Sequence, residues 1–138
     1  MQNIMKPENS EEAIRVASKD IFDKFGIRFT EVENGKACGE LVLLQEHRNF
    51  YGIPYGGILF NLADNTAGIA FASAGGNGVT ISGNVNFLRG AGSETEKLIC
   101  QATVKKAGKH LFFVSAEIRD NYDTVLSEYS FVFTNLSK

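Results

Sequence analysis

The sequence is poor in the residues from which metal sites and covalently braced scaffolds are built. Its two cysteines, Cys38 and Cys100, form no CxxC pair and have no histidine beside them. We therefore expect neither a disulfide framework nor a metal site, and we interpret both cysteines as small buried apolar residues. The two histidines, His47 and His110, lack a partner at the spacing of a Ser-His-Asp or metal arrangement.

An excess of positive charge is also missing. Fourteen Lys and Arg face sixteen Asp and Glu, which gives a net charge of −2 and a pI of about 5.7. This balance argues against nucleic acid as a main partner. Residues 1–13 contain no apolar run, so we expect no signal peptide and a cytoplasmic protein. With no repeat or linker, residues 1–138 are expected to form a single domain.

One long apolar stretch, residues 47–74, dominates what is present. After the Gly56-Gly57 pair it runs without proline and almost without charge. A helix of about 18 residues here would be about 27 Å long. Such a helix is buried on most sides or spans a membrane. Asp64 and Asn65 at its centre would each need a partner in lipid, so we predict a buried central helix and no membrane partner.

A polar face interrupts this helix, because Asn61, Asp64 and Asn65 fall at positions i, i+3 and i+4. One interpretation is a solvated stripe. The other is a carboxylate in an apolar site, suited to act as a base or a nucleophile. Gly56 and Gly57 would bring backbone N–H groups and the positive end of the helix dipole close to a ligand.

The flanking segments predict the rest of the fold. Asn9 and Glu12 resemble a capping box before a short amphipathic helix that Gly26 ends. Asn34-Gly35 is typical of a β-hairpin turn. Four further runs have strand character, at residues 79–88, 97–106, 110–120 and 124–135. Two strands, a helix and four successive strands predict an α+β fold, with an antiparallel sheet wrapped around one long helix.

Three smaller features have alternative interpretations. Strict alternation in residues 79–88 would place Thr80 on an unusually polar face, opposite Val79. Asn49 either satisfies its own turn or donates to a substrate oxygen. The cluster of Lys105, Lys106, Lys109 and His110 is either a solvated turn or a phosphate contact, and we expect Arg89 to emerge at the same rim.

Four motifs together resemble those of the hotdog-fold acyl-CoA thioesterases, most of all the PaaI-like, phenylacetate-degradation branch. They are His47-x-Asn49-x-x-Gly52-x-x-Tyr55-Gly56-Gly57, Leu62-Ala63-Asp64, Gly78-Val79-Thr80 and Asn86-Phe87-Leu88-Arg89. The resemblance implies a sheet curled around a central helix, pairing of protomers into a homodimer or dimer of dimers, and hydrolysis of an acyl-CoA. Phenylalanine-rich strands make an aryl acyl group one expected substrate.

The resemblance also implies catalytic roles. The position of Asp64 supplies the base or nucleophile, acting across the subunit interface. Gly56 offers its backbone N–H to the thioester carbonyl, and Asn49 helps to hold the carbonyl or the attacking water. Thr80 hydrogen-bonds near the nucleophile. Tyr55 replaces a histidine that is usual in the family. It is expected to support the carbonyl or to steady Asn49 as a neutral donor; the alternative is that it only packs at the mouth of the pocket.

Substrate binding is expected at six further residues. Gly57 lies at the helix start and Asn65 on the polar face, whereas the phosphates of coenzyme A would lie against basic residues, namely Arg89, Lys106, Lys109 and His110. Coenzyme A is then part of the substrate, and no cofactor is expected. Two alternatives remain: an acyl-CoA binding or sensing module without turnover, and an acyl-thioester hydratase. The hydratase is disfavoured because hotdog relatives use an Asp-His pair for that chemistry, and no histidine is near Asp64 in sequence.

Overall fold

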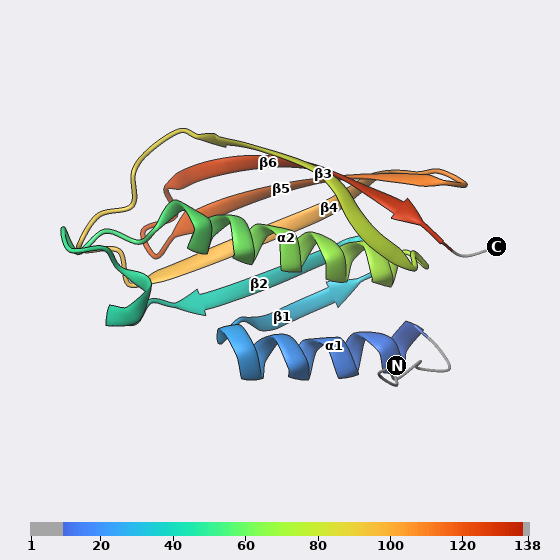
Figure 1. The fold of residues 1–138 in the computed structure, drawn as a ribbon, viewed down its shortest axis with the longest axis horizontal. Helices are drawn as coiled ribbons and strands as arrows, with labels where there is room; N and C mark the ends of the chain where they lie inside the picture. The colour runs from blue at the N-terminus through green and yellow to red at the C-terminus, as the bar shows by residue number, and fades with distance from the viewer. Residues whose placement is uncertain (1–9, 137–138) are drawn as a thin grey trace, which may run out of the picture.

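The computed structural model describes residues 10–136 and shows one antiparallel sheet with two helices on the same side (Figure 1). In chain order the elements are α1 (Ser10–Phe25), β1 (Arg28–Glu33), β2 (Lys36–Val42), the 3₁₀ turn η1 (Gln45–His47), α2 (Gly56–Ser73), β3 (Gly78–Phe87), β4 (Lys97–Ala107), β5 (Leu111–Asp120) and β6 (Val125–Asn135). The strand order is β1-β2-β4-β5-β6-β3. This is the predicted α+β arrangement, although Asn9 of the predicted capping box lies outside the described residues.

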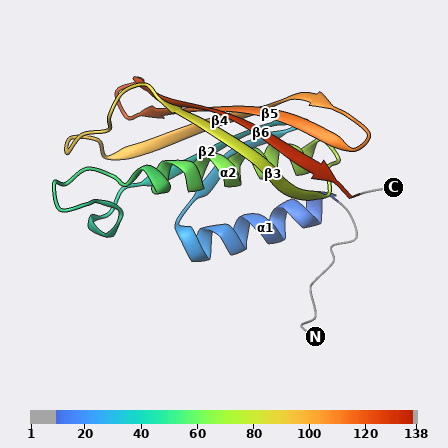
Figure 2. The same cartoon turned by 45° about the horizontal axis from the view of Figure 1, so that its top comes forward.

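The central helix α2 is held in the hollow of the curved sheet, as Figure 2 shows. It has 18 residues, and its sheet-facing side is buried. Phe71 stacks on Phe133 with the ring centroids 4.7 Å apart and meets Phe112 edge-on. After the helix the chain turns through Gly75, whose φ of +89° is a conformation that favours glycine. The buried apolar contacts between α2 and the strands thus form the core.

The hairpin between β1 and β2 is tied to the end of α2. Gly35 adopts a φ of +82°, as the predicted Asn-Gly turn requires. Its backbone N–H donates to Ser73 Oγ over 2.9 Å, and the same hydroxyl donates to the Glu33 carbonyl over 2.6 Å. One serine therefore connects the turn to the last residue of the helix.

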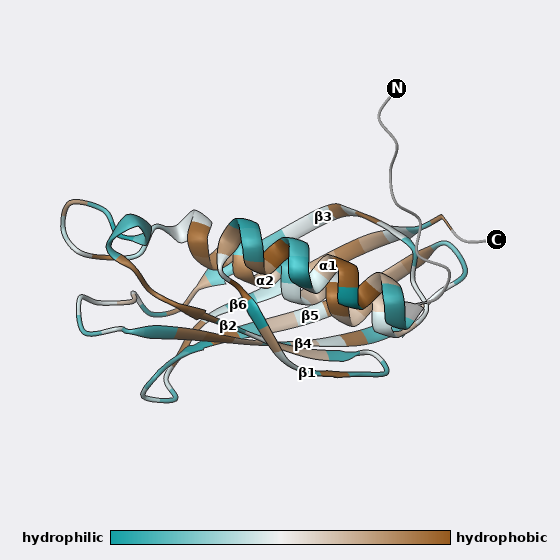
Figure 3. Cartoon of the chain, turned by 90° about the horizontal axis from the view of Figure 1, so that it is seen from below, coloured by the Kyte–Doolittle hydropathy of each residue, from teal (hydrophilic) through white to brown (hydrophobic). Residues whose placement is uncertain are grey.

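Helix α1 packs against α2 and β1. Hydrophilic and hydrophobic residues interleave along it (Figure 3), and Ile14, Ala17 and Ile21 contact the core. This agrees with the amphipathic pattern of its sequence. Within residues 10–136 no helix is both long enough and apolar enough to span a membrane.

The predicted alternation of β3 is wrong. Thr80 pairs with Phe133 and Ser82 with Val132, so Ile81 is an extra residue that forms a β-bulge. Thr80 shares the α2-facing side of the sheet with its buried partner Phe133, whereas Val79 on the preceding position is exposed. Because a bulge shifts the two-residue period, Thr80 does not lie on one face with the polar residues that follow it.

Candidate active site

The Asp64 carboxylate is held by a residue of β3. Asp64 lies in the third turn of α2, is half-buried, and accepts a hydrogen bond from Thr80 Oγ1 over 2.7 Å. Its second oxygen, Oδ2, accepts no hydrogen bond within residues 10–136. The contact fixes the orientation of the carboxylate and leaves one oxygen available to a water or a substrate.

The N-terminus of α2 presents unpaired backbone donors. Gly56 and Gly57 are the first two helical residues, and the N–H groups of a first turn have no intrahelical acceptor. Tyr55 precedes them as the N-cap, but its side chain does not cap the helix. A Cβ added to Gly56 would lie 3.2 Å from the Phe87 ring, whereas one added to Gly57 would meet no atom within 4 Å. The helix start is thus packed on β3 at Gly56 and open at Gly57, and the helix dipole makes it favourable for an anion.

The hydrogen bonds of Asn49 are compatible with both of the roles that the sequence suggested for it. Its Oδ1 accepts hydrogen bonds from the backbone N–H groups of Tyr51 at 2.9 Å and Ile53 at 3.1 Å, so the carbonyl shapes its own loop. Its Nδ2 donates to no residue within the described part of the chain. The amide N–H₂ is therefore a free donor in the loop that leads into α2.

Arg48 organises the same loop, and the sequence analysis missed it. Its guanidinium donates to the carbonyls of Gly52 at 2.9 Å, Gly92 at 3.4 Å and Thr95. It therefore connects the loop between η1 and α2, residues 48–55 (the Asn49 loop), to the segment after β3. Arg48 could have been singled out because it is an arginine in a turn-rich segment that contains no acidic residue. The motif that begins at His47 allows any residue at this position, so it gave no indication of this role.

Tyr55 and His47 flank the loop in different ways. The Tyr55 side chain is 54% exposed, and its hydroxyl has no hydrogen-bond partner in residues 10–136. His47 Nδ1 accepts the Leu44 N–H over 2.9 Å, so the neutral ring carries its proton on Nε2. His47 therefore has a local structural role. Neither histidine is hydrogen-bonded to Asp64, and no group of three metal-ligating side chains occurs in the described residues.

Asn65 does not join the Asp64 carboxylate. Its Nδ2 donates to the side-chain oxygen of Asn61 at 2.6 Å and to the Asn61 carbonyl at 3.0 Å. The polar face of α2 therefore consists of a self-bonded pair of asparagines next to Asp64. This places Asn65 near the candidate site without giving it a direct contact to the carboxylate.

The candidate residues form two separate groups in one protomer. Gly56 and Asp64 are eight residues apart on α2, which corresponds to about 12 Å along the helix axis. The Asn49 loop and Tyr55 lie at the Gly56 end, and Thr80 lies at the Asp64 end. A single thioester carbonyl cannot lie within hydrogen-bond distance of both groups, so one protomer presents two half-sites.

The predicted common rim of Arg89 and the basic turn is wrong. The Arg89 N–H donates to the Leu126 carbonyl at the start of β6. The start of β6 lies at the same end of the sheet as the start of β4. Lys106, Lys109 and His110 lie at the β4–β5 turn, which is the other end of β4 and about 30 Å away. The antiparallel pairing of β3 with β6 directs Arg89 away from that turn.

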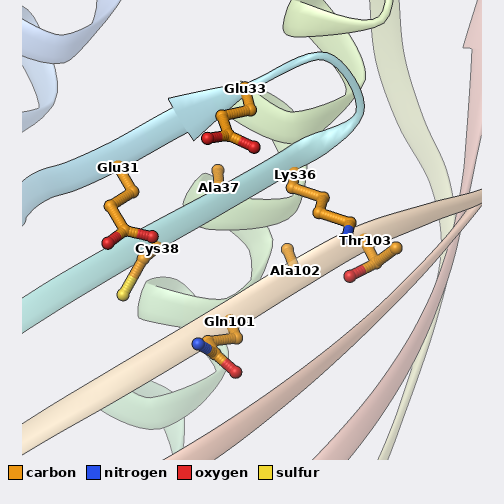
Figure 4. Close-up of a pocket in the computed structure, with 8 residues that line it drawn as sticks. All are labelled: Glu31, Glu33, Lys36, Ala37, Cys38, Gln101, Ala102 and Thr103. Carbon is orange, nitrogen blue, oxygen red and sulfur yellow. The ribbon is translucent and has the colours of Figure 1, made fainter.

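The two cysteines lie on opposite faces of the sheet. Cys100 is fully buried beneath α2, and burial raises the pKa of its thiol to about 12. Cys38 is only half-buried and points away from α2, into a shallow hollow of about 210 Å³ on the outer face (Figure 4). The prediction that both are buried is therefore wrong for Cys38, because neighbouring strands place the two residues on different faces.

Comparison with known proteins defines the family. The sequence profile of the Thioesterase superfamily matches residues 51–127, more than half of the chain, and the chain belongs to this superfamily. Human acyl-coenzyme A thioesterase 13 is 31% identical over 86 residues, and the match spans 61% of each protein.

Solved structures show the same fold. The PaaI protein of the E. coli phenylacetic acid degradation operon has a TM-score of 0.81 and 21% identity, covering 91% of this chain and 98% of that one. A hypothetical thioesterase protein from Streptococcus pneumoniae, solved with coenzyme A, has a TM-score of 0.80 and 18% identity, covering 92% and 97%. The predicted hotdog fold and the predicted class of enzyme, a thioesterase, are both confirmed.

Proposed function

We propose that the protein hydrolyses acyl-CoA thioesters at a site that two protomers share. One protomer supplies Asp64 and Thr80, and its partner supplies the Gly56 N–H and Asn49. The observation that carries the proposal is the Asp64 carboxylate, fixed by the 2.7 Å hydrogen bond from Thr80, in a chain of the Thioesterase superfamily. The acyl-CoA substrate is supported by the similarity to human acyl-coenzyme A thioesterase 13.

The chemistry follows from these groups. The free oxygen of Asp64 either takes a proton from a water that attacks the thioester carbonyl or attacks that carbon itself. The oxygen that develops negative charge is stabilised by the Gly56 N–H and by the Asn49 amide, donors whose effect is large in a site closed to water. The carbon–sulfur bond then breaks, the thiolate of coenzyme A takes up a proton, and water provides the second oxygen of the product acid.

The free edge of β3 supports the shared site. β3 has ten residues and pairs only with β6, so its other edge is unpaired within the described residues. Val79 and Ile81 beside this edge are more than half exposed. A long edge strand that carries exposed apolar side chains is a template for pairing with another chain. Antiparallel pairing of two β3 strands would set the helix start of one protomer opposite the middle of α2 of the other.

The same pairing suggests how coenzyme A is held. It would bring the β4–β5 turn of one protomer, with Lys106, Lys109 and His110, toward the Arg89 end of its partner. The phosphates would then contact basic residues of both chains. A cytoplasmic homodimer or dimer of dimers remains our expectation from the sequence.

The phenylalanine-rich strands, from which the sequence suggested an aryl acyl substrate, do not by themselves support that substrate. Phe112, Phe131 and Phe133 of β5 and β6 are buried in the core against α2, so their rings do not line an open pocket. We therefore keep phenylacetyl-CoA as one member of a substrate panel that also contains straight-chain acyl-CoAs.

The first test is Asp64→Asn in an assay of thiol release over this panel. Asparagine keeps an oxygen that can accept from Thr80, so the fold is retained while the base or nucleophile is lost. We expect kcat to fall by about 10² to 10⁴-fold with binding of the acyl-CoA retained. Asp20→Asn, at an exposed aspartate of α1 paired with Lys24, is the control.

Two results would overturn the proposal. Undiminished turnover in Asp64→Asn removes this residue from the mechanism. Binding of acyl-CoA by the natural protein without release of thiol from any substrate identifies a binding module instead.

A further inference from the structure

One guanidinium joins two segments at the end of the molecule where α2 begins. Arg48 belongs to the Asn49 loop, whereas residues 88–96 connect β3 to β4. In Figure 1 the loop is green and the connection yellow, and both lie at the left end. Arg48 donates to the Gly52 carbonyl in its own loop over 2.9 Å. It also donates to the carbonyls of Gly92 and Thr95 in the connection.

The connection that receives these hydrogen bonds is itself ordered. Thr95 is buried, and its backbone N–H donates to the Gly92 carbonyl over 3.2 Å. Its hydroxyl accepts the Gly92 N–H over 3.1 Å. The loop and the connection also approach each other directly, since a Cβ added to Gly52 would lie 3.8 Å from that of Ser93. Arg48 therefore attaches the loop to a segment that its own hydrogen bonds hold in place.

The contacts of Arg48 enclose Asn49, the residue proposed to hold the thioester carbonyl. The two residues are neighbours in the chain, and Gly52, whose carbonyl Arg48 binds, donates its N–H to the Asn49 carbonyl over 2.9 Å. Arg48 also forms a β-bridge with Pro54, two residues before Gly56. The shape of this loop therefore determines where the free Nδ2 of Asn49 points.

The acceptors of Arg48 favour a positioning role over a contact with substrate. All three are backbone carbonyls, and Arg48 forms no ion pair with a carboxylate in the described residues. They take up three of the five N–H donors of the guanidinium. A rigid, planar fork can reach several carbonyls at once, whereas the single nitrogen of a lysine cannot reproduce that arrangement.

We propose that Arg48 is a positioning residue for thioester hydrolysis. By attaching the loop to the β3–β4 connection, it holds the Asn49 amide where the carbonyl oxygen develops negative charge. The inference rests on the proposed function for the role of Asn49. A donor of this kind is effective only when it is preorganised, and a displacement of about 1 Å costs about 100-fold in rate.

Arg48→Gln and Arg48→Lys test the proposal in the assay of thiol release. We expect kcat to fall by about 10- to 100-fold and KM to change by less than about twofold. The loss should be the same for acetyl-CoA and octanoyl-CoA. Arg48→Lys should lose about as much as Arg48→Gln, because it keeps the charge but not the fork. Arg119→Gln is the matched control, since Arg119 donates to the Asp123 carbonyl in a turn that carries no candidate residue.

A double variant tests whether Arg48 acts through Asn49. In an Asn49→Ala background, Arg48→Gln should lower kcat by less than about twofold, because the residue that it positions is already gone. An equal loss in both backgrounds overturns the proposal. A rise in KM alone that Arg48→Lys reverses would identify a phosphate contact instead. Lower stability in urea with kcat unchanged would leave Arg48 with a structural role only.

Hydrogen exchange supplies a readout that needs no turnover. The backbone N–H groups of Tyr51 and Ile53 donate to Asn49 Oδ1. They should exchange about tenfold faster in Arg48→Gln, and Arg119→Gln should leave them unchanged. Unchanged exchange in Arg48→Gln of an active protein overturns the role of Arg48 alone. If the natural protein hydrolyses no acyl-CoA, the proposed function fails, and this role in the reaction fails with it.

Discussion

At the scale of single residues, Tyr55 stands where the motif that this sequence resembles usually has a histidine. The ring is 54% exposed at the N-cap of α2, beside the Gly56 amide, and its hydroxyl is uncommitted within the described residues. A phenol is a neutral donor. We therefore expect Tyr55 to support the thioester carbonyl without adding a charge change.

Tyr55→Phe removes only that hydroxyl. We predict that kcat/KM falls by about tenfold, the effect of losing one hydrogen bond in the transition state. Tyr55→His should retain activity and add a step near pH 6.5 to the rate profile, where histidine ordinarily titrates. Tyr51→Phe in the same exposed loop serves as the control. A Phe variant as fast as the parent on the best substrate would show that Tyr55 only fills space.

At the scale of elements, the contact between α2 and β2 depends on Gly39. A Cβ at this position would collide with Thr66 Oγ1 and would lie 3.3 Å from the Phe29 ring. Thr66 is buried, and its hydroxyl donates to the Leu62 carbonyl over 2.7 Å. The strand can approach the helix this closely because glycine has no side chain.

Gly39→Ala should lower the free energy of unfolding by about 1–3 kcal/mol, measured by urea denaturation, because it overpacks this contact. Adding Thr66→Ala removes the oxygen that the new methyl group meets. The double variant should then be more stable than the sum of the two single effects predicts, by about 1 kcal/mol. Gly57→Ala is the control, since its Cβ meets nothing within 4 Å. Strict additivity of the two changes would show that Thr66 is not the residue that limits the approach.

At the scale of the whole molecule, the proposed shared site requires a second copy of the chain. Mixing two inactive variants tests this requirement. Asp64→Asn lacks the carboxylate, and Asn49→Asp lacks the donor N–H₂ while keeping the oxygen that accepts from the loop. A mixed dimer would contain one intact site, formed by Asp64 of one chain and Asn49 of the other.

Unfolding and refolding an equal mixture of the two variants should therefore restore about a quarter of the natural activity, because half of the dimers are mixed and each has one intact site of two. Each variant refolded alone is the control and should remain inactive. Failure of the mixture to regain activity, with dimers demonstrated by sedimentation, would place the whole site within one chain. A protein that sediments as a stable monomer at micromolar concentration would exclude the shared site altogether.

The sequence alone determined the elements of this protein, because local signals specify them. The apolar stretch ended by glycines predicted α2, the Asn34-Gly35 turn predicted the first hairpin, and the runs of strand character predicted the other four strands. The motifs in these segments predicted the superfamily and indicated Asp64 and Gly56 as candidate catalytic residues.

Only the tertiary structure decided how these residues lie relative to one another. The bulge at Ile81 sets the face on which Thr80 lies, and the strand order separates Arg89 from the basic turn. A groove lined by residues of α1, β2, η1 and α2 forms only where these four segments meet. Strand register and the packing of distant segments depend on pairing partners far along the chain, so periodicity within one segment cannot specify them.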